Sequence, residues 1–165
     1  LGAVFKASGN PPPITSHAKA VHLIEDLRRW RAHYRIPMRL PTELPFPLNA
    51  LLPMRVAMVA EERGLSASYC RAVMQAYWQQ GVDVSLPQGL TEVLRRLDLD
   101  VDDTLQQAQT QASKDALRAN TDEAVARGAF GAPSMFIGEA LYVGNDRLPF
   151  VEAHLLGQAP WLEAR

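Results

Sequence analysis

The segment R-G-A-F-G-A-P-S-M-F, residues Arg127 to Phe136, decides the fold of this chain. Gly128 can take the positive φ that ends a helix, so the chain can turn sharply here. The Ala132–Pro133 bond is a candidate for the cis isomer, which is common only before proline. A cis bond would turn the N–H and C=O of Ala132 outward, where an extended peptide could pair with them as with a sheet edge. The alternative is an ordinary helix-to-strand loop with a trans proline.

The residues after Pro133 predict a β-hairpin. Strands are expected over Ser134–Ile137 and Ala140–Val143, since both segments are short and apolar and a turn signal separates them. That signal is Gly138-Glu139, in which glycine comes first, as a two-residue type II′ turn requires.

A helix is expected to follow the hairpin. Asn145 or Asp146 is placed to cap it, and it should run to about Leu156. A helix, a proline-led strand, a tight hairpin, a second strand and a capped helix, in this order, form the C-terminal half of a thioredoxin fold. The fold class predicted for the chain is therefore α/β.

The long segment before Arg127 shows helical signals and no strand signal. Apolar residues recur at helical spacing from Thr15 to Tyr34, and Asn49, Ser66 and Asp100 are placed to cap later helices. We expect a thioredoxin-like fold, with its C-terminal half present, that carries a large all-helical insertion domain. The predicted parts are a remnant of the N-terminal thioredoxin half with a ligand loop (1–14), the helical insertion (15–111) and the C-terminal thioredoxin half (112–165).

The composition is that of an ordinary globular domain. The 165 residues are 47% hydrophobic and 21% charged, with a net charge of −1, so nucleic acid and anionic membranes are not expected as partners. No apolar run approaches the ~18 residues that span a bilayer. The single cysteine excludes an intrachain disulfide and a cysteine-based zinc site, and it favours a cytoplasmic location. The four histidines do not have metal-ligand spacing, so no metal is expected.

The motif R-G-A-F-G-A-P-S-M-F-I-G, followed by G-N-D-R-L-P-F-V, resembles the 2-hydroxychromene-2-carboxylate isomerase family and its relatives, the kappa-class glutathione transferases. Both are thioredoxin folds interrupted by a helical insertion. In this family a strand, a helix and a second strand precede the position of Leu1. We therefore expect an N-terminal segment upstream of this sequence, and the catalytic serine of the family would lie in it.

The resemblance implies that glutathione binds along the proline-led edge. Its γ-glutamyl end would lie at Asn145 and Asp146, where a helix N-terminus suits a carboxylate and the Asp146 carboxylate suits an ammonium group. Simple helix capping is the alternative for these two residues and is compatible with binding. The expected glutathione-binding residues are Asn10, Lys19, Ala132, Pro133, Asn145 and Asp146.

Two of these residues lie near the start of the sequence. Residues Leu1 to Pro13 are predicted to form a loop, in which three prolines stiffen the chain after Asn10. The Asn10 amide would contact a polar ligand, or the loop would be only a rigid linker. Lys19 lies in the first turns of a helix, where a cation is unfavourable for the helix, which suggests an anionic ligand; a solvated lysine is the alternative.

The function that the resemblance implies is a glutathione-dependent isomerase of aromatic-compound catabolism, acting on a small aromatic substrate as a homodimer. A kappa-like glutathione transferase and a thiol–disulfide oxidoreductase of the same fold are the alternatives, and a Cys-x-x-Cys motif upstream would favour the second of them. An inactive, truncated ligand-binding fragment is a third possibility.

Overall fold

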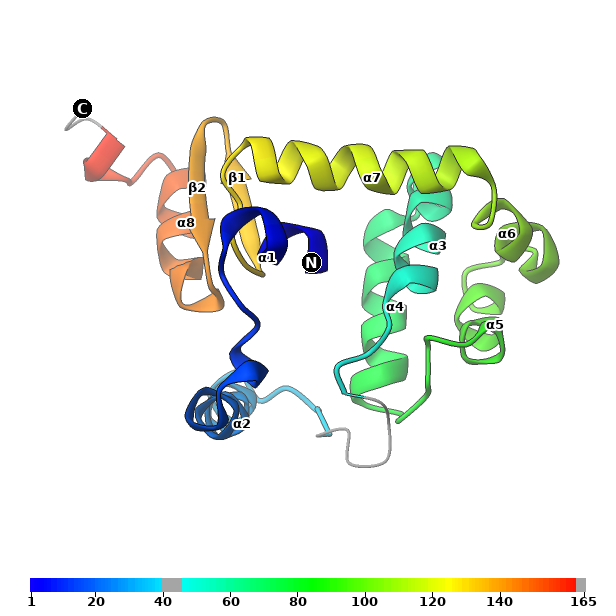
Figure 1. Cartoon of the computed structure of the whole chain (residues 1–165), viewed down its shortest axis with the longest axis horizontal. Coiled ribbons are helices and arrows are strands. Elements are labelled where there is room, and N and C mark those ends of the chain that lie inside the picture. The colour runs from blue at the N-terminus through cyan, green and yellow to red at the C-terminus, as the bar shows by residue number, and fades with distance from the viewer. Residues whose placement is uncertain (40–45, 163–165) are drawn as a thin grey trace. The chain divides into compact units, whose positions relative to one another are not determined.

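A computed structural model of the chain describes residues 1–39 and 46–162 (Figure 1). The chain divides into two compact units. The hairpin unit comprises Leu1–Val21 and Ala119–Arg165, and the helical unit comprises His22–Arg118. Both boundaries between the units fall within helices, whereas the sequence placed the boundaries at residues 14 and 111.

The hairpin unit holds both strands of the described chain. Its elements are α1 (Gly2–Ser8), the 3-10 turn η1 (Pro13–Thr15), the start of α2 (His17–His33), the end of α7 (Gln111–Ala126), β1 (Ser134–Ile137), β2 (Ala140–Val143), the 3-10 turn η2 (Asn145–Arg147), α8 (Leu148–Leu155) and the 3-10 turn η3 (Pro160–Leu162).

The predicted hairpin is confirmed residue by residue. β1 and β2 pair antiparallel with Ile137 opposite Ala140 and Ser134 opposite Val143. Gly138 has a φ of +54°, the positive value that the first position of the turn needs. The described sheet contains these two strands only. The hairpin thus follows from the turn chemistry of this short segment.

The helical unit is built around a buried apolar core, as its sequence pattern predicts. Its complete helices are α3 (Leu51–Glu62), α4 (Ser66–Trp78), α5 (Pro87–Arg95) and α6 (Val101–Gln107). Val56, Ala60, Leu90 and Leu94 are wholly buried at 0% exposure. Residues 40–45 of the predicted insertion lie outside the described residues. The part of this unit that the structure describes contains no strand.

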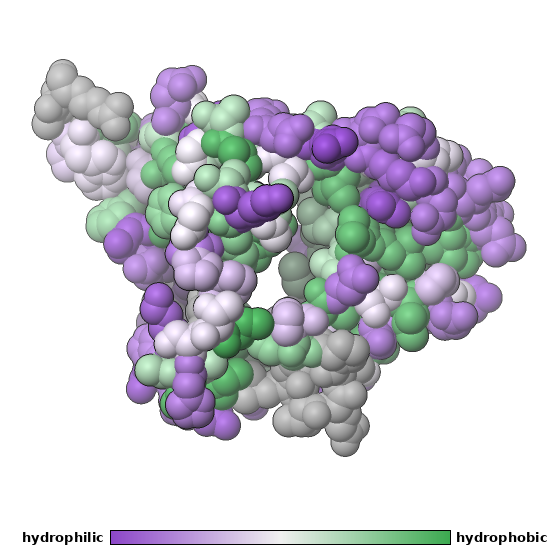
Figure 2. All heavy atoms as spheres, viewed as in Figure 1, coloured by the Kyte–Doolittle hydropathy of each residue, from purple (hydrophilic) through white to green (hydrophobic). Residues whose placement is uncertain are grey.

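Polar side chains fix helix ends and helix contacts in this unit. The Asp100 carboxylate accepts a hydrogen bond from the Asp103 N–H at 2.8 Å, so Asp100 caps α6 as predicted. The buried Tyr69 hydroxyl donates to the Pro53 carbonyl at 2.9 Å and thereby joins α4 to α3. Figure 2 shows hydrophilic residues along the visible face of α7 and hydrophobic residues among the helices of this unit.

The prediction that Leu1 to Pro13 form a loop is wrong for Gly2–Ser8, which form α1. The glycine, asparagine and proline residues that suggested a loop are concentrated after Ser8. The earlier residues A-V-F-K-A include good helix formers, and the helix buries Val4. Gly9, with a φ of +67°, ends the helix.

Candidate ligand-binding site at the proline-led strand

Ala132 and Pro133 lead into β1 with exposed side chains. The bond between them is cis. The N–H and C=O of Ala132 have no hydrogen-bond partner among residues 1–39 and 46–162. An exposed main chain with a free donor and a free acceptor can pair with an extended ligand, as the edge of a sheet does.

Asn10, which is distant in the sequence, forms a hydrogen bond to this segment. Its side-chain Nδ2 donates a hydrogen bond to the Phe130 carbonyl at 3.0 Å, across 120 residues of sequence. The side-chain amide therefore holds the chain two residues before Ala132. The sequence led us to expect only a ligand contact or a rigid linker at Asn10, and the structure adds a specific link to the proline-led segment.

Arg127 holds the end of α7 against the hairpin. One of its guanidinium nitrogens donates to the Gly138 carbonyl at 2.7 Å, and the other forms an ion pair with Glu123 at 3.3 Å. The guanidinium carbon lies 4.0 Å from the centroid of the Phe136 ring, a cation–π geometry. These contacts fix both ends of the segment that contains Ala132.

The hairpin ladder brings Asn145 and Asp146 next to the proline-led segment. The Gly144 N–H donates to the Pro133 carbonyl at 2.9 Å, so the chain that enters η2 runs beside Pro133. Gly144 has a φ of +102°, a conformation that favours glycine. Asn145 is half-buried and Asp146 is exposed. Four of the six expected site residues therefore lie together on neighbouring stretches of main chain.

The prediction that Asn145 or Asp146 caps the last helix is wrong. A 3-10 turn covers Asn145–Arg147, Arg147 is the N-cap of α8, and neither predicted residue makes a capping hydrogen bond. With Asp146 as the cap, the third helical residue would be Pro149, which has no N–H to donate. The Asp146 carboxylate instead pairs with the Arg147 guanidinium at 3.0 Å.

Lys19 is exposed in the first turn of α2. Its side chain makes no ion pair or hydrogen bond with the residues that the structure describes. The structure therefore leaves its ammonium group available for an anionic ligand, but no contact joins Lys19 to the segment around Ala132.

A group of aromatic residues on the same unit has no counterpart among the predicted site residues. The Trp161 indole N–H donates to the Tyr142 hydroxyl at 3.3 Å, and that hydroxyl forms a second hydrogen bond with His154 Nδ1 at 2.9 Å. The ring of Phe150 lies edge-on to that of Trp161, with 5.3 Å between centroids. Trp161 is 19 residues from Tyr142, so no local pattern in the sequence predicts this contact.

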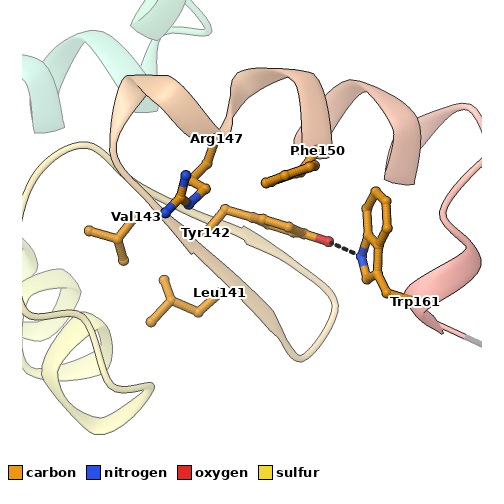
Figure 3. Close-up of a pocket in the computed structure, with 6 residues that line it drawn as sticks. All are labelled: Leu141, Tyr142, Val143, Arg147, Phe150 and Trp161. Carbon is orange, nitrogen blue, oxygen red and sulfur yellow. Dashed lines mark hydrogen bonds between the residues drawn. The ribbon is translucent and has the colours of Figure 1, made fainter. Parts of the chain in front are cut away.

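These side chains line a pocket of about 360 Å³ (Figure 3). Figure 3 shows the Tyr142 ring extending toward Trp161, with Leu141 and Val143 pointing away from it. The lining residues are Leu141, Tyr142, Val143, Arg147, Phe150 and Trp161. Arg147 belongs to the G-N-D-R motif, but no sequence pattern predicts its place at this pocket.

Residues 1–39 and 46–162 contain no group of three or more His, Cys, Asp or Glu side chains that could hold a metal ion. None of the helices in these ranges has both the length and the apolar character needed to cross a bilayer.

The fold and the site define a class of protein: a thioredoxin-type domain with a helical insertion and an exposed main-chain segment before a proline-led strand. The family of DSBA-like thioredoxin domains matches residues 1–156. The chain therefore belongs to this family.

Curated relatives and a solved structure narrow the comparison. The chain is 31% identical over 164 residues to glutathione S-transferase kappa 2 of Caenorhabditis elegans, and this alignment covers 92% of this chain and 73% of the relative. It is 29% identical over 153 residues to 2-hydroxychromene-2-carboxylate isomerase of Sphingobium xenophagum, covering 91% and 76%. A solved structure of a 2-hydroxychromene-2-carboxylate isomerase superposes with a TM-score of 0.83 at 27% identity, covering 93% of this chain and 75% of the other.

Proposed function

We propose that the chain is a glutathione-dependent isomerase of the 2-hydroxychromene-2-carboxylate type, acting on a small aromatic substrate in aromatic-compound catabolism. The names of the relatives support this class of activity: one group is named for the isomerisation and the other for glutathione. Its single cysteine agrees with a cytoplasmic location, and the family resemblance agrees with a homodimer.

The observation that carries the proposal is the free main chain of Ala132 beside Asn145 and Asp146. Glutathione is an extended tripeptide with a main-chain donor and acceptor at its cysteine and a zwitterionic γ-glutamyl end. The main chain of Ala132 can pair with the donor and acceptor of the glutathione cysteine. The Asn145 amide and the Asp146 carboxylate can bind the γ-glutamyl end. The residues present therefore fit this ligand.

The other residues would orient the tripeptide. Lys19 offers a cation without an ion-pair partner among the described residues, which suits a glutathione carboxylate. Asn10 would act indirectly, since it holds the Phe130 carbonyl and so the approach to Ala132. When bound, glutathione would supply a thiol whose thiolate adds reversibly to the substrate and leaves again.

The relatives also favour a second candidate, a kappa-like glutathione transferase, since the C. elegans kappa protein is 31% identical. A thiol–disulfide oxidoreductase is a third candidate, and the name of the matching family is what favours it. The reaction separates the three: the isomerase returns glutathione unchanged, the transferase consumes one glutathione per product, and the oxidoreductase changes the thiol–disulfide balance.

The test is a spectrophotometric assay of the full-length gene product with 2-hydroxychromene-2-carboxylate, with and without glutathione. We expect conversion to the ring-opened isomer, trans-2′-hydroxybenzylidenepyruvate, that needs glutathione but does not consume it. Conversion at the same rate without glutathione would contradict the proposal. Stoichiometric loss of free thiol would favour the transferase instead.

A further inference from the structure

The pocket of Figure 3 opens along the edge of β2 that has no paired strand among the described residues. Successive side chains of a strand point to opposite faces of a sheet. A pocket that is lined by three consecutive residues, Leu141, Tyr142 and Val143, therefore lies along the edge of the strand and not on one face. Because β1 occupies the other edge, the pocket follows the unpaired edge of β2.

The strand register shows which main-chain groups face this edge. In a two-residue hairpin, Ile137 and Ala140 form the first hydrogen-bonded pair, and such pairs then alternate along the ladder. The bond from the Gly144 N–H to the Pro133 carbonyl fits this alternation. The N–H and C=O groups of Leu141 and Val143 therefore point away from β1. Across the described residues, no hydrogen bond outside the hairpin ladder reaches these groups.

The side chains beside this edge are apolar and aromatic, with a single charge. Phe150 is 46% exposed and Trp161 is 39% exposed, so their rings are open to a ligand. Arg147 supplies the one charged group in the lining, with its guanidinium 5.9 Å from the Phe150 centroid. Its pair with Asp146 is solvent-exposed on both sides, and such pairs hold their partners weakly.

We propose that this edge binds an extended peptide segment by strand addition. The segment would pair its main chain with Leu141 and Val143, place one apolar or aromatic side chain in the pocket, and place an acidic side chain beside Arg147. The free main-chain groups favour a peptide over a small molecule, since a small ring can fill the pocket but leaves these donors and acceptors unused. The two sites use different main chain, since glutathione would pair with Ala132 before β1 and the peptide with β2, and they adjoin at the ion pair between Asp146 and Arg147.

The test is titration of ¹⁵N-labelled protein with a blocked heptapeptide in which threonine alternates with glutamate, phenylalanine and valine. We expect saturable shifts of the Leu141, Val143 and Arg147 amides. Two N-methylated versions serve as controls, one methylated at the threonines and one at the other three residues. In a strand, the N–H groups of alternate residues face opposite edges, so either the threonine N–H groups or those of the other three residues face β2. The version methylated on the set that faces β2 should bind at least about tenfold more weakly, and the other version should bind about as well as the parent peptide.

Matched protein variants test the pocket. Phe150→Ala should weaken peptide binding severalfold, whereas Phe130→Ala, at a similarly exposed phenylalanine of the same unit outside the pocket, should not. A peptide with glutamine in place of glutamate should bind roughly 1.5- to 5-fold more weakly. Equal affinity of these two peptides would contradict the acidic partner.

Three results would overturn the proposal of strand addition. One is the absence of saturable shifts, and another is equal binding of both N-methylated peptides. The third is displacement of the peptide at equal or lower concentration by naphthalene-1-carboxylate, which has no main chain to pair. A glutathione titration of the same samples separates this result from the proposed enzymatic function, because glutathione binding is read at the Ala132 amide and peptide binding at the Leu141 and Val143 amides.

Discussion

The helical unit and the hairpin unit differ in how completely they bury their own residues. In the helical unit, Leu90 and Leu94 are wholly buried within one apolar cluster. In the hairpin unit, every residue of both strands is only half-buried, and rings such as Phe150 remain exposed. One unit therefore holds the apolar core, and the other leaves main chain and aromatic rings exposed, which is where we propose that ligands bind.

The largest expected effect concerns the core of the helical unit. Leu90→Ala should lower the free energy of unfolding by about 2–5 kcal/mol, since it leaves a cavity at a position with 0% exposure. Leu155→Ala makes the same chemical change in the hairpin unit at 70% exposure, and it should stay within about 0.5 kcal/mol. Urea denaturation followed by circular dichroism measures both. Similar losses for the two variants would remove the difference between the units.

A second substitution tests how tightly the helical unit is packed around its turns. A Cβ at Gly89 would collide with the main-chain carbonyl of Asp83. Gly89→Ala should therefore cost about 1–3 kcal/mol, in spite of the better helix propensity of alanine. Gly2→Ala, where an added Cβ has open space, is the matched control and should be neutral within about 0.5 kcal/mol. Full stability of Gly89→Ala would show that the Asp83 loop moves freely.

The buried tyrosine of the core should make stability depend on pH. Burial raises the pKa of the Tyr69 hydroxyl from its ordinary value of 10.0. The folded protein then keeps a proton that the unfolded chain releases above about pH 10, so the free energy of unfolding should fall as the pH rises above 10.

Tyr69→Phe separates this effect from the hydrogen bond to Pro53. The variant should lose about 1 kcal/mol at neutral pH, because the Pro53 carbonyl loses its donor. It should also show a shallower fall in stability above pH 10. A slope unchanged from that of the parent protein would mean that other groups produce the alkaline transition.

The smallest expected change in stability is in the hairpin unit. Asn10→Ala removes the exposed hydrogen bond to the Phe130 carbonyl and should leave unfolding within about 0.5 kcal/mol. It should weaken glutathione binding by roughly two- to tenfold, since the segment before Ala132 loses its support. Calorimetric titration measures the affinity. Asn10→Asp, which keeps the shape but lacks the donor, should behave like the alanine variant.

Local chemistry made much of the hairpin unit predictable. The glycine-first turn, the proline and the short apolar segments each act over a few residues, so they indicated both strands with the bounds that the structure has. Of the three predicted caps only Asp100 is confirmed. The predictions at Asn49 and Ser66 are wrong as to the N-cap residue, since the N-caps of α3 and α4 are Ala50 and Leu65 and neither makes a side-chain capping bond.

The errors and omissions arose where distant or competing groups decide the structure. The helix over Gly2–Ser8 was not predicted, because the glycine, asparagine and prolines that follow Ser8 favour a loop and led us to expect one over the whole segment. The expected cap at Asn145 or Asp146 failed because a 3-10 turn covers Asn145–Arg147, which moves the start of the helix to Leu148, and because Arg147 engages the Asp146 carboxylate. The pocket was missed because its lining combines β2 with Trp161, and only the folded chain brings them together.

The central claim is that glutathione binds at the main chain of Ala132. The most direct measurement is a glutathione titration of ¹⁵N-labelled protein, with the amide shifts followed residue by residue. We predict saturable shifts centred on Ala132, Asn145 and Asp146. Saturable binding that leaves these three amides unchanged, or no binding at millimolar glutathione, would contradict the claim.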